Sequence, residues 1–439
     1  MRTEPQLAAR EIFRELIEID TTDATGDNDR AAHAMARRLV DAGLPAADVQ
    51  VLGPEPRKAN LVARMRGSGN RPPLLMLAHL DVVDADPEEW TTHPFAFVEK
   101  DGFFYGRGTT DDKAMAAIWV ANLVRFLQEG FIPDRDLILA LTADEEGGSH
   151  NGASWLLEHH RELVDAAFGL NEGGTGRARG GRYLSNMLQA SEKVYVDFEL
   201  VATGRPGHSS VPTGDNAIYH LASALQRIAE YRFPARLSEI TRAFFDRMAT
   251  IESEETAADM RAILRDPPDP AAIERLSAVP YYNGVLRTTC VATRLDAGQA
   301  NNTIPQSARA ILNCRLLPGE SAEEVQQTLI ELVAGGPVEV SPLAPPKPSP
   351  PSPLTDEIMR PVERITEELW PGVPVVPVMG IGATDSLRFR QAGIPMYGVS
   401  GIFFDMGDVR AHCPDERIET RSFYDGLEFL CRLVRSLSS

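Results

Sequence analysis

Cysteine is scarce in this sequence, and its few copies form no recognisable framework. The 439 residues include four cysteines, Cys290, Cys314, Cys413 and Cys431, without a CxxC pair or a short regular spacing. Disulfide-stapled folds and cysteine-rich zinc sites both depend on such spacing, so the sequence favours neither. Because a free cysteine commonly packs as a small hydrophobe, we expect free thiols in a reducing compartment.

The sequence also has no long hydrophobic run and no surplus of positive charge. No apolar run approaches the roughly 18 residues of a transmembrane helix. Lys and Arg number 44 against 63 Asp and Glu, and the net charge of −19 argues against a nucleic-acid or membrane partner. The opening MRTEPQLAAREIFREL is a mixed-charge amphipathic pattern without the apolar core of a secretory signal. We therefore expect a cytoplasmic protein.

The rest of the composition is that of an ordinary globular protein. Hydrophobic residues make up 43% of the chain and charged residues 24%, which suits a protein with large buried cores. These values do not separate an enzyme from a binding protein.

The first part of the chain alternates buried strands with a helical pattern. Apolar runs at 73–83, 136–143 and 166–171 read as strands, and residues 114–128 read as a packed crossover helix. Continuous apolar strands joined by such a helix predict a parallel or mixed sheet covered on both faces.

From about residue 187 the pattern changes to half-buried strands with helices between them. This pattern predicts a small sheet with helices on one face. A charged helical stretch at 233–280 reads as an insertion into it. The expected strands are 193–202, 286–297, 307–317 and 337–343, and the expected helices are 216–231 and 322–334.

A proline-rich segment ends this second region. Seven prolines fall within residues 342–353, which predicts a semi-rigid connector. After it the first pattern returns, with helices at 354–369, 384–391 and from about 420, and strands at 374–379 and 395–399. We predict an α/β domain with a mixed, mostly parallel sheet, formed by residues 1–186 and 346–439. A smaller α+β domain, residues 187–345, interrupts it.

Polar clusters follow the predicted strands, where open α/β sheets bind their ligands. A lone histidine at a strand end is more often structural than a ligand. Together, however, the clusters supply two histidines and several carboxylates, the ligand chemistry of a zinc pair. The clusters are His79–Asp81, Gly106–Lys113, Asp144–Glu146, Asn171–Gly174 and Arg410–Arg417.

Two other interpretations of these clusters are weak. GRGTTDDK lacks the spacing of a phosphate-binding P-loop, and its two aspartates would repel phosphate. A serine or cysteine nucleophile is poorly supported because no G-x-S-x-G elbow occurs and no cysteine has an obvious histidine partner.

Eight motifs in order along the chain resemble the M20 family of co-catalytic zinc metallopeptidases. This family includes carboxypeptidases, dipeptidases, aminoacylases and N-acyl-amino-acid deacylases. HPF (93–95), GTTDDK and GHSSVP are most similar to its Gly-Xaa carboxypeptidase and N-fatty-acyl-amino-acid hydrolase branch. The eight motifs are AHLDVV (78–83), YGRGTTDDK (105–113), TADEEGG (142–148), NEGG (171–174), GRPGHSSVP (204–212), NNTIP (301–305), CRLLPG (314–319) and AHCPDERI (411–418).

The resemblance implies two zinc ions per subunit, at a site that could also accept cobalt or manganese. One ion would be held by His79, Asp111 and Glu172, and the other by Asp111, Glu146 and His412, with Asp111 as the bridge.

The resemblance also implies the groups that act beside the metals. Glu145 would be the general base, taking a proton from the metal-bridging water and delivering it to the leaving amine. Asp81 would orient the site. A cis peptide bond would join Asp111 to Asp112.

By the same resemblance, residues 1–186 and 346–439 form the catalytic domain, and the inserted residues 187–345 form a lid and dimerisation domain that supplies substrate contacts. His208 would stabilise the oxyanion, often from the partner subunit of a homodimer formed through the lid. Arg315 and Asn302 would hold the substrate's carboxylate. Gly382 and Thr384 lie in a segment that matches a substrate-side loop.

The resemblance therefore predicts a hydrolase that cleaves an amide bond beside a free C-terminal carboxylate, in a small peptide or an N-acyl amino acid. An alternative is a deacylase of N-acetyl or N-succinyl amino acids. A third possibility, of another class, is an inactive metal-binding assembly subunit.

Overall fold

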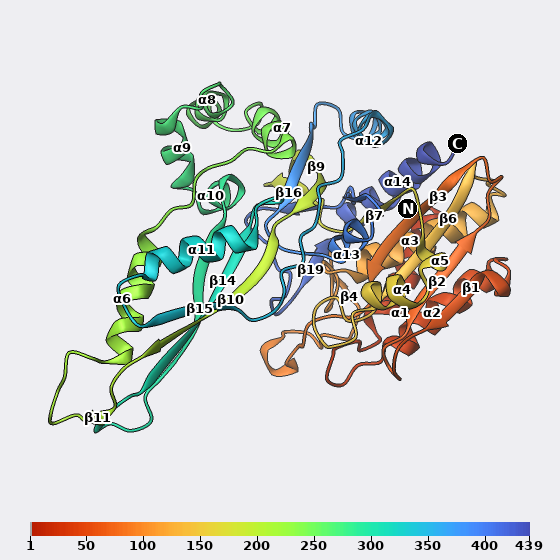
Figure 1. Cartoon of the computed structure of the whole chain (residues 1–439). Coiled ribbons are helices and arrows are strands. Elements are labelled where there is room, and N and C mark those ends of the chain that lie inside the picture. The colour runs from red at the N-terminus through yellow and green to blue at the C-terminus, as the bar shows by residue number, and fades with distance from the viewer. Residues whose placement is uncertain (1) are drawn as a thin grey trace. The chain divides into compact units, whose positions relative to one another are not determined.

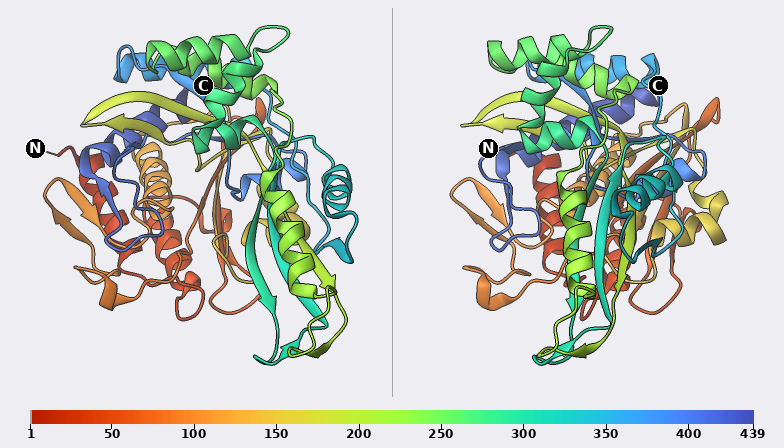
Figure 2. Two further views of the ribbon diagram at one scale, coloured as in Figure 1. Left: turned by 90° about the vertical axis from the view of Figure 1, so that its left-hand side faces the viewer. Right: turned by 60° about the vertical axis from the view of Figure 1, so that its left-hand side comes forward.

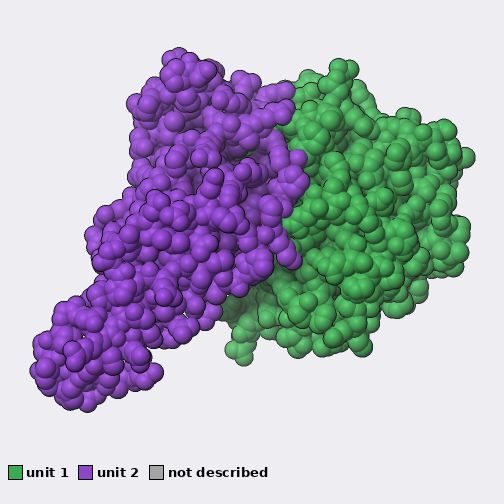
Figure 3. Space-filling view, in the orientation of Figure 1, with its two compact units in different colours: residues 1–190, 352–378, 384–439 green, residues 191–351, 379–383 purple. Residues whose placement is uncertain are grey.

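The computed structural model describes residues 2–439 and divides into two compact units (Figure 3). Unit 1 contains the residues up to Ala190 together with Ser352–Val378 and Thr384–Ser439. Unit 2 contains Ser191–Pro351 and the short segment Met379–Ala383. The chain therefore crosses from unit 1 to unit 2 between residues 190 and 191 and returns between residues 351 and 352. The predicted limits of the inserted domain were residues 187 and 345.

Unit 1 is built on a large mixed sheet of order β1-β2-β6-β3-β7-β17-β9-β8-β18, with β16 paired to β9. Its central strands β6, β3, β7 and β17 run parallel, as their continuous apolar sequences predict. The strands are β1 (Val49–Leu52), β2 (Asn60–Met65), β3 (Arg71–His79), β6 (Arg135–Thr142), β7 (Phe168–Asn171), β8 (Gly176–Arg179), β9 (Arg182–Glu192), β16 (Val375–Gly380), β17 (Met396–Gly398) and β18 (Phe403–Asp405).

Helices cover both faces of this sheet (Figure 1). On one face, Leu75 and Leu77 of β3 pack in a buried cluster with Leu156 and Phe389. On the other, the Trp119 indole donates a hydrogen bond of 3.0 Å to the Leu77 carbonyl. The mixed α/β fold predicted from the sequence is confirmed. The helices are α1 (Glu4–Ile17), α2 (Asn28–Asp41), α3 (Lys113–Gln128), α4 (Gly152–His159), α5 (Arg161–Val164), α12 (Asp356–Leu369), α13 (Ser386–Gln391) and α14 (Thr420–Leu437).

A small separate sheet of unit 1 joins distant parts of the chain. Strand β5 (Phe103–Tyr105) pairs with β4 (Val98–Lys100) and with β19 (Arg417–Glu419). This pairing brings the segment before β19 beside the segment after β5.

Unit 2 has a four-stranded antiparallel sheet of order β12-β14-β10-β15. Its core lies between the sheet and two helices, because the inward side chains of β10 and β14 pack against them. The strands are β10 (Val194–Thr203), β12 (Thr289–Ala297), β14 (Ser307–Leu316) and β15 (Val338–Pro342), and the helices are α6 (Ala217–Glu230) and α11 (Ala322–Val333).

The two ends of unit 2 carry different structures (Figures 1 and 2). At one end lie the helices of the insertion, which run on to residue 286 rather than ending at 280. At the other end the strand pair β11 (Gly207–His208) and β13 (Thr303–Ile304) forms a narrow tip. The insertion helices are α7 (Glu239–Met248), α8 (Glu254–Ile263), α9 (Pro270–Ser277) and α10 (Pro280–Leu286).

The proline-rich connector forms neither helix nor strand over residues 343–355. It is nevertheless fixed, since the buried Ser352 hydroxyl donates to the Met396 carbonyl at 2.8 Å and accepts from the Met396 amide at 2.9 Å. In the helices of residues 2–439, no apolar stretch is long enough to cross a membrane.

The expectation of four free thiols is wrong, because Cys290 and Cys314 form a disulfide. They lie 24 residues apart in sequence, but they are directly opposite each other on the antiparallel strands β12 and β14. Cys314 is fully buried, and Cys413 and Cys431 remain free. Sequence spacing did not reveal the pair because strand register, not proximity along the chain, brings the two sulfurs together.

This pairing predicts the number of reactive thiols. In the native protein we expect an alkylating reagent to label the exposed Cys413 quickly, and after denaturation without reductant to label Cys431 as well. Intact-mass spectrometry then counts two alkyl groups, against four in a control sample reduced first. Four groups without reductant would contradict the disulfide.

Candidate metal centre

The predicted metal-ligating residues of unit 1 meet at one edge of the central sheet. Strand β3 ends at His79, Glu146 follows the end of β6, and Glu172 follows the end of β7. Because these strands are parallel and adjacent, their carboxyl ends meet at the same edge. Asp111 lies just before α3, and His412 lies in the loop before β19.

The Asp111 carboxylate lies between two imidazoles. Its Oδ1 is 3.0 Å from His79 Nε2, and its Oδ2 is 3.2 Å from His412 Nε2. His412 Nε2 is also 2.9 Å from Glu146 Oε1, and His79 Nε2 is 3.9 Å from Glu172 Oε1. Each oxygen of Asp111 therefore belongs to a separate group of nitrogen and oxygen donors, the arrangement that a bridge between two cations requires.

Asp81 forms hydrogen bonds with two of the predicted metal ligands, His79 and Glu146. The Asp81 backbone carbonyl accepts a hydrogen bond of 2.9 Å from His79 Nδ1, which leaves Nε2 of that ring free to bind a metal. Its side-chain Oδ2 accepts from the Glu146 amide at 2.9 Å, while the buried Oδ1 has no hydrogen-bond partner.

The crowded carboxylates of the centre favour the binding of cations. Burial, together with the nearby Asp111 carboxylate, raises the pKa of Glu146 to about 6, although His79 and His412 oppose the shift. Burial also raises the pKa of Glu172 well above its usual value. Hydrogen bonding to Asp111 raises the pKa of His412 to about 9. Bound divalent ions would offset this crowding of carboxylates, so the donor set fits metal chemically as well as geometrically.

Glu145 lies beside the ligands. Burial raises its pKa to about 9, helped by Asp385 and Glu146 and opposed by His79. An oxygen of Glu145 also lies within 4.8 Å of donor atoms of His79 and Glu172. The structure thus places the predicted base close to two predicted metal ligands.

Comparison with known proteins identifies the family of the chain. The sequence profile of the peptidase family M20/M25/M40 matches residues 75–436 of this chain. The chain belongs to this family. The M20 family is metal-dependent, and its members' activities identify the chain as a hydrolytic enzyme.

Individual M20 relatives cover most of the chain. The N-fatty-acyl-amino acid synthase/hydrolase PM20D1 of Xenopus tropicalis is 31% identical over 381 residues, which span 85% of this chain and 74% of the relative. Aminoacylase-1B of Rattus norvegicus is 25% identical over 451 residues, covering 98% and 95%. The M20 family metallo-carboxypeptidase Sso-CP2 from Sulfolobus solfataricus has the same fold, with a TM-score of 0.72, 17% identity and coverage of 98% and 99%.

Glu416 is a residue of this M20 site to which the sequence analysis gave no role. It is fully buried, and its Oε1 accepts from the Thr110 amide at 2.6 Å and from the Asp111 amide at 3.2 Å. Its Oε2 pairs with Arg107 at 2.8 Å and accepts from the Gly108 amide at 3.0 Å. Glu416 therefore fixes the loop that presents Asp111. Its position in the motif AHCPDERI was the available clue.

The backbone around the ligands has unusual conformations. The peptide bond between Asp111 and Asp112 is cis, which confirms what the family resemblance implied. His412 and Asp144 have φ values of 64° and 57°, in the left-handed region that few non-glycine residues adopt.

Asp385 is a second buried acid near the centre. Its Oδ2 accepts from the Thr142 hydroxyl at 2.8 Å and its Oδ1 from the Asn151 amide at 2.7 Å. The predicted substrate residue Thr384 precedes it, and the Thr384 hydroxyl accepts from the Ser386 amide at 3.2 Å.

The other predicted substrate residues lie in unit 2. His208 and Asn302 meet at the tip, where Thr303 lies opposite His208 and the Ser209 amide donates to the Asn302 carbonyl at 3.0 Å. Arg315 lies on β14, away from that tip. Gly382 is exposed in the segment Met379–Ala383.

Proposed function

We propose that this M20 enzyme is a two-zinc hydrolase that cleaves an amide bond beside a free carboxylate, in a peptide or an N-acyl amino acid. One observation carries the proposal: the Asp111 carboxylate lies between His79 and His412, with Glu145 beside them.

We assign the metals to the ligand sets given above. His79, Asp111 and Glu172 would hold one ion, and Asp111, Glu146 and His412 the other. When bound, two zinc ions supply an activated water and polarise the substrate carbonyl. Imidazole and carboxylate ligands suit zinc and also accept cobalt or manganese.

Two residues of the chain itself carry out the remaining chemistry. Glu145 takes the proton of the attacking water and transfers it to the nitrogen of the leaving amine. His208 donates a hydrogen bond to the oxyanion that develops on the former carbonyl oxygen. Asp81 keeps the His79 ring in the orientation that exposes Nε2.

We propose that Arg315, with Asn302, binds the substrate carboxylate. The Arg315 guanidinium lies 4.6 Å from the centre of the Tyr195 ring and donates to the Asn313 side-chain oxygen at 3.2 Å. Within residues 2–439 it forms no ion pair with a carboxylate, so its charge is free for an anionic ligand.

Replacing Arg315 with alanine is expected to raise KM about 100-fold and to lower kcat much less. The reason is that a charge-assisted hydrogen-bond pair to a carboxylate contributes about 2–3 kcal/mol to binding. Steady-state kinetics measure the effect. Arg309→Ala is the matched control, because Arg309 lies on the same strand and pairs with Glu199 at 3.3 Å. Equal KM values for the two variants would contradict the assignment.

A small-acyl deacylase is the second candidate, favoured by the similarity to aminoacylase-1B along nearly the whole chain. The inactive-subunit alternative has less support, since the ligand set and Glu145 are all present. A mass-spectrometric panel of dipeptides and of short- and long-chain N-acyl amino acids, run on zinc-loaded enzyme, tests the proposal. Cleavage of none of them would overturn it.

We also propose that the enzyme forms a homodimer through unit 2. The strand β12 lies at an edge of its sheet, and its apolar Val291 and Leu295 are 61% and 65% exposed. Exposed apolar edge strands commonly pair with another chain. Sedimentation velocity measures the state, and a monomer at micromolar concentration would contradict it. Mixing His208→Ala with Glu145→Ala subunits would restore activity only if His208 acts across the dimer.

A further inference from the structure

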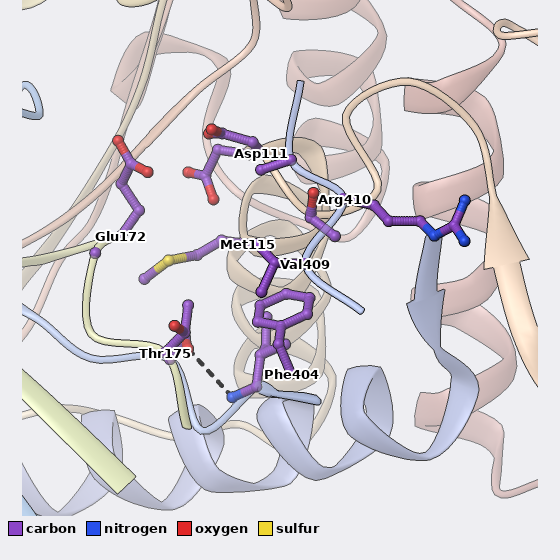
Figure 4. Close-up of a pocket in the computed structure, with 13 residues that line it drawn as sticks. Asp111, Met115, Glu172, Thr175, Phe404, Val409 and Arg410 are labelled. Carbon is purple, nitrogen blue, oxygen red and sulfur yellow. Dashed lines mark hydrogen bonds between the residues drawn. The ribbon is translucent and has the colours of Figure 1, made fainter. Parts of the chain in front are cut away.

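Two loops of the metal centre are supported in different ways. The Asp111 loop borders a cavity of about 260 Å³ that lies between α3 and residues 400–411 (Figure 4). Glu416 holds this loop by accepting hydrogen bonds from its backbone amides. The loop that follows β6, residues 143–151, has a separate support.

Asp144 lies at the start of this second loop and directly precedes Glu145 and Glu146. Its φ of 57° places a left-handed turn at the residue before the predicted base. The Asp144 carboxylate folds back into the loop, where its Oδ2 accepts from the His150 amide at 3.2 Å, and the side chain is only 1% exposed. Gly148 leaves room for it, because a Cβ at that residue would clash with Oδ2. A carboxylate is therefore buried inside the loop that carries the base.

Lys58 supplies the positive charge that this buried carboxylate requires. Its Nζ donates to Asp144 Oδ1 at 2.5 Å and to Asp23 Oδ1 at 2.5 Å. The Asp23 side chain is 59% exposed, and an exposed ion pair contributes little to stability. Removing one partner of a buried pair is strongly destabilising, because the other charge is left without compensation. The pair with Asp144 is therefore the contact through which Lys58 fixes the loop.

The backbone beside Lys58 is itself held in place. The Ala59 amide donates to Asp29 Oδ1 at 2.8 Å. The buried Asn60 side chain, at the start of β2, accepts from the Ala143 amide at 2.9 Å. Lys58 and Asn60 thus hold consecutive residues of the loop from the same end of β2.

We infer that Lys58 is a positioning residue for Glu145 and acts through the buried carboxylate of Asp144. The inference rests on the proposed hydrolase function and adds a residue that lies outside the family match at 75–436. Without the Lys58 charge, the Asp144 carboxylate moves toward water, and the turn that it shapes shifts Glu145. A displacement of about 1 Å can lower the rate about 100-fold. Glu146 depends less on the pair, because Asp81 also holds its amide.

Replacing Lys58 with methionine tests the inference. We expect kcat to fall about 100-fold and KM to change less than about threefold, while two equivalents of zinc remain bound. Lys58→Arg keeps the charge and should keep kcat within about fivefold of the wild-type value. Lys100→Met is the matched control, since Lys100 is an exposed lysine of β4 and its loss should leave kcat unchanged. Wild-type kcat in Lys58→Met, an equal loss in the control, or loss of zinc would overturn the inference.

A double variant provides a second test, because an uncompensated buried charge can prevent folding. Lys58→Met combined with Asp144→Asn removes both charges, and the asparagine oxygen can still accept from the His150 amide. Replacing both partners of a buried ion pair with neutral groups is often nearly neutral. We therefore expect the double variant to have a kcat within about tenfold of wild type. A kcat about 100-fold below wild type would overturn the inference.

A measurement without substrate separates this inference from the proposed function. In hydrogen–deuterium exchange of the zinc-loaded enzyme, the peptide over residues 143–151 should exchange at least about tenfold faster in Lys58→Met than in wild type or Lys100→Met. Faster exchange, together with a wild-type enzyme that cleaves no peptide or N-acyl amino acid, would overturn the proposed function and retain Lys58 as the support of the loop. Cleavage by the wild type, with exchange and kcat unchanged in Lys58→Met, would retain the function and overturn the inference.

Discussion

Replacing Asp111 with asparagine is expected to remove bound metal and to lower kcat/KM at least about 1,000-fold. Within residues 2–439, Asp111 is the one carboxylate whose two oxygens face His79 and His412, at 3.0 and 3.2 Å. Its loss removes a charge that both ions would share, and metal polarisation of the carbonyl is worth several kcal/mol in the transition state. Metal content by mass spectrometry and steady-state kinetics measure the two effects.

The control for this variant is the same aspartate-to-asparagine substitution at a residue far from the site. Asp101→Asn makes the same substitution at an exposed residue beside β5 and should leave metal content and kcat/KM unchanged. Two equivalents of zinc retained by Asp111→Asn would show that Asp111 is not the bridge.

Replacing Glu145 with glutamine is expected to lower kcat about 100- to 10,000-fold while metal content stays the same. General acid–base catalysis contributes a factor of about this size, and an amide cannot accept the proton of the attacking water. The variant keeps the volume of the side chain and its place beside His79 and Glu172. Kinetics on enzyme with a measured zinc content separate lost catalysis from lost metal.

The neighbouring residue provides a matched comparison. Glu146→Gln alters a proposed metal ligand, 2.9 Å from His412 Nε2, and should lose zinc together with activity. The structure also places Glu145 among candidate ligand atoms, so the outcome discriminates between two roles. Loss of zinc from Glu145→Gln would make Glu145 a ligand rather than the base.

The central strands, and the edge of the sheet at which the site lies, could be predicted from the sequence. Strands β3, β6 and β7 are continuous apolar runs, and each is followed by the polar residues that gather at the centre. The ligand roles themselves came from motif resemblance, since a histidine after a strand has no single meaning.

Other features depend on tertiary contacts that local patterns do not encode. Strand β9 was not predicted, because its buried side chains include Ser185, Asn186 and Gln189, which give no hydrophobic pattern. In the sequence, Glu416 does not differ from many other charged residues. Only the structure shows that it is buried and accepts hydrogen bonds from the loop that carries Asp111. The cavity between α3 and residues 400–411 could not be predicted either, because its wall joins segments that lie far apart in the sequence.

The links between Glu416 and the Asp111 loop also bear on biosynthesis. His79, Asp111, Glu146 and Glu172 precede unit 2 in the chain, whereas His412 and Glu416 follow it. As the ribosome makes the protein, the first four proposed ligands emerge well before His412, the proposed fifth ligand, and Glu416. The complete proposed centre therefore cannot form on a nascent chain until unit 2 has been translated. A chain whose synthesis stops within unit 2 lacks His412 and Glu416 and therefore has no finished site.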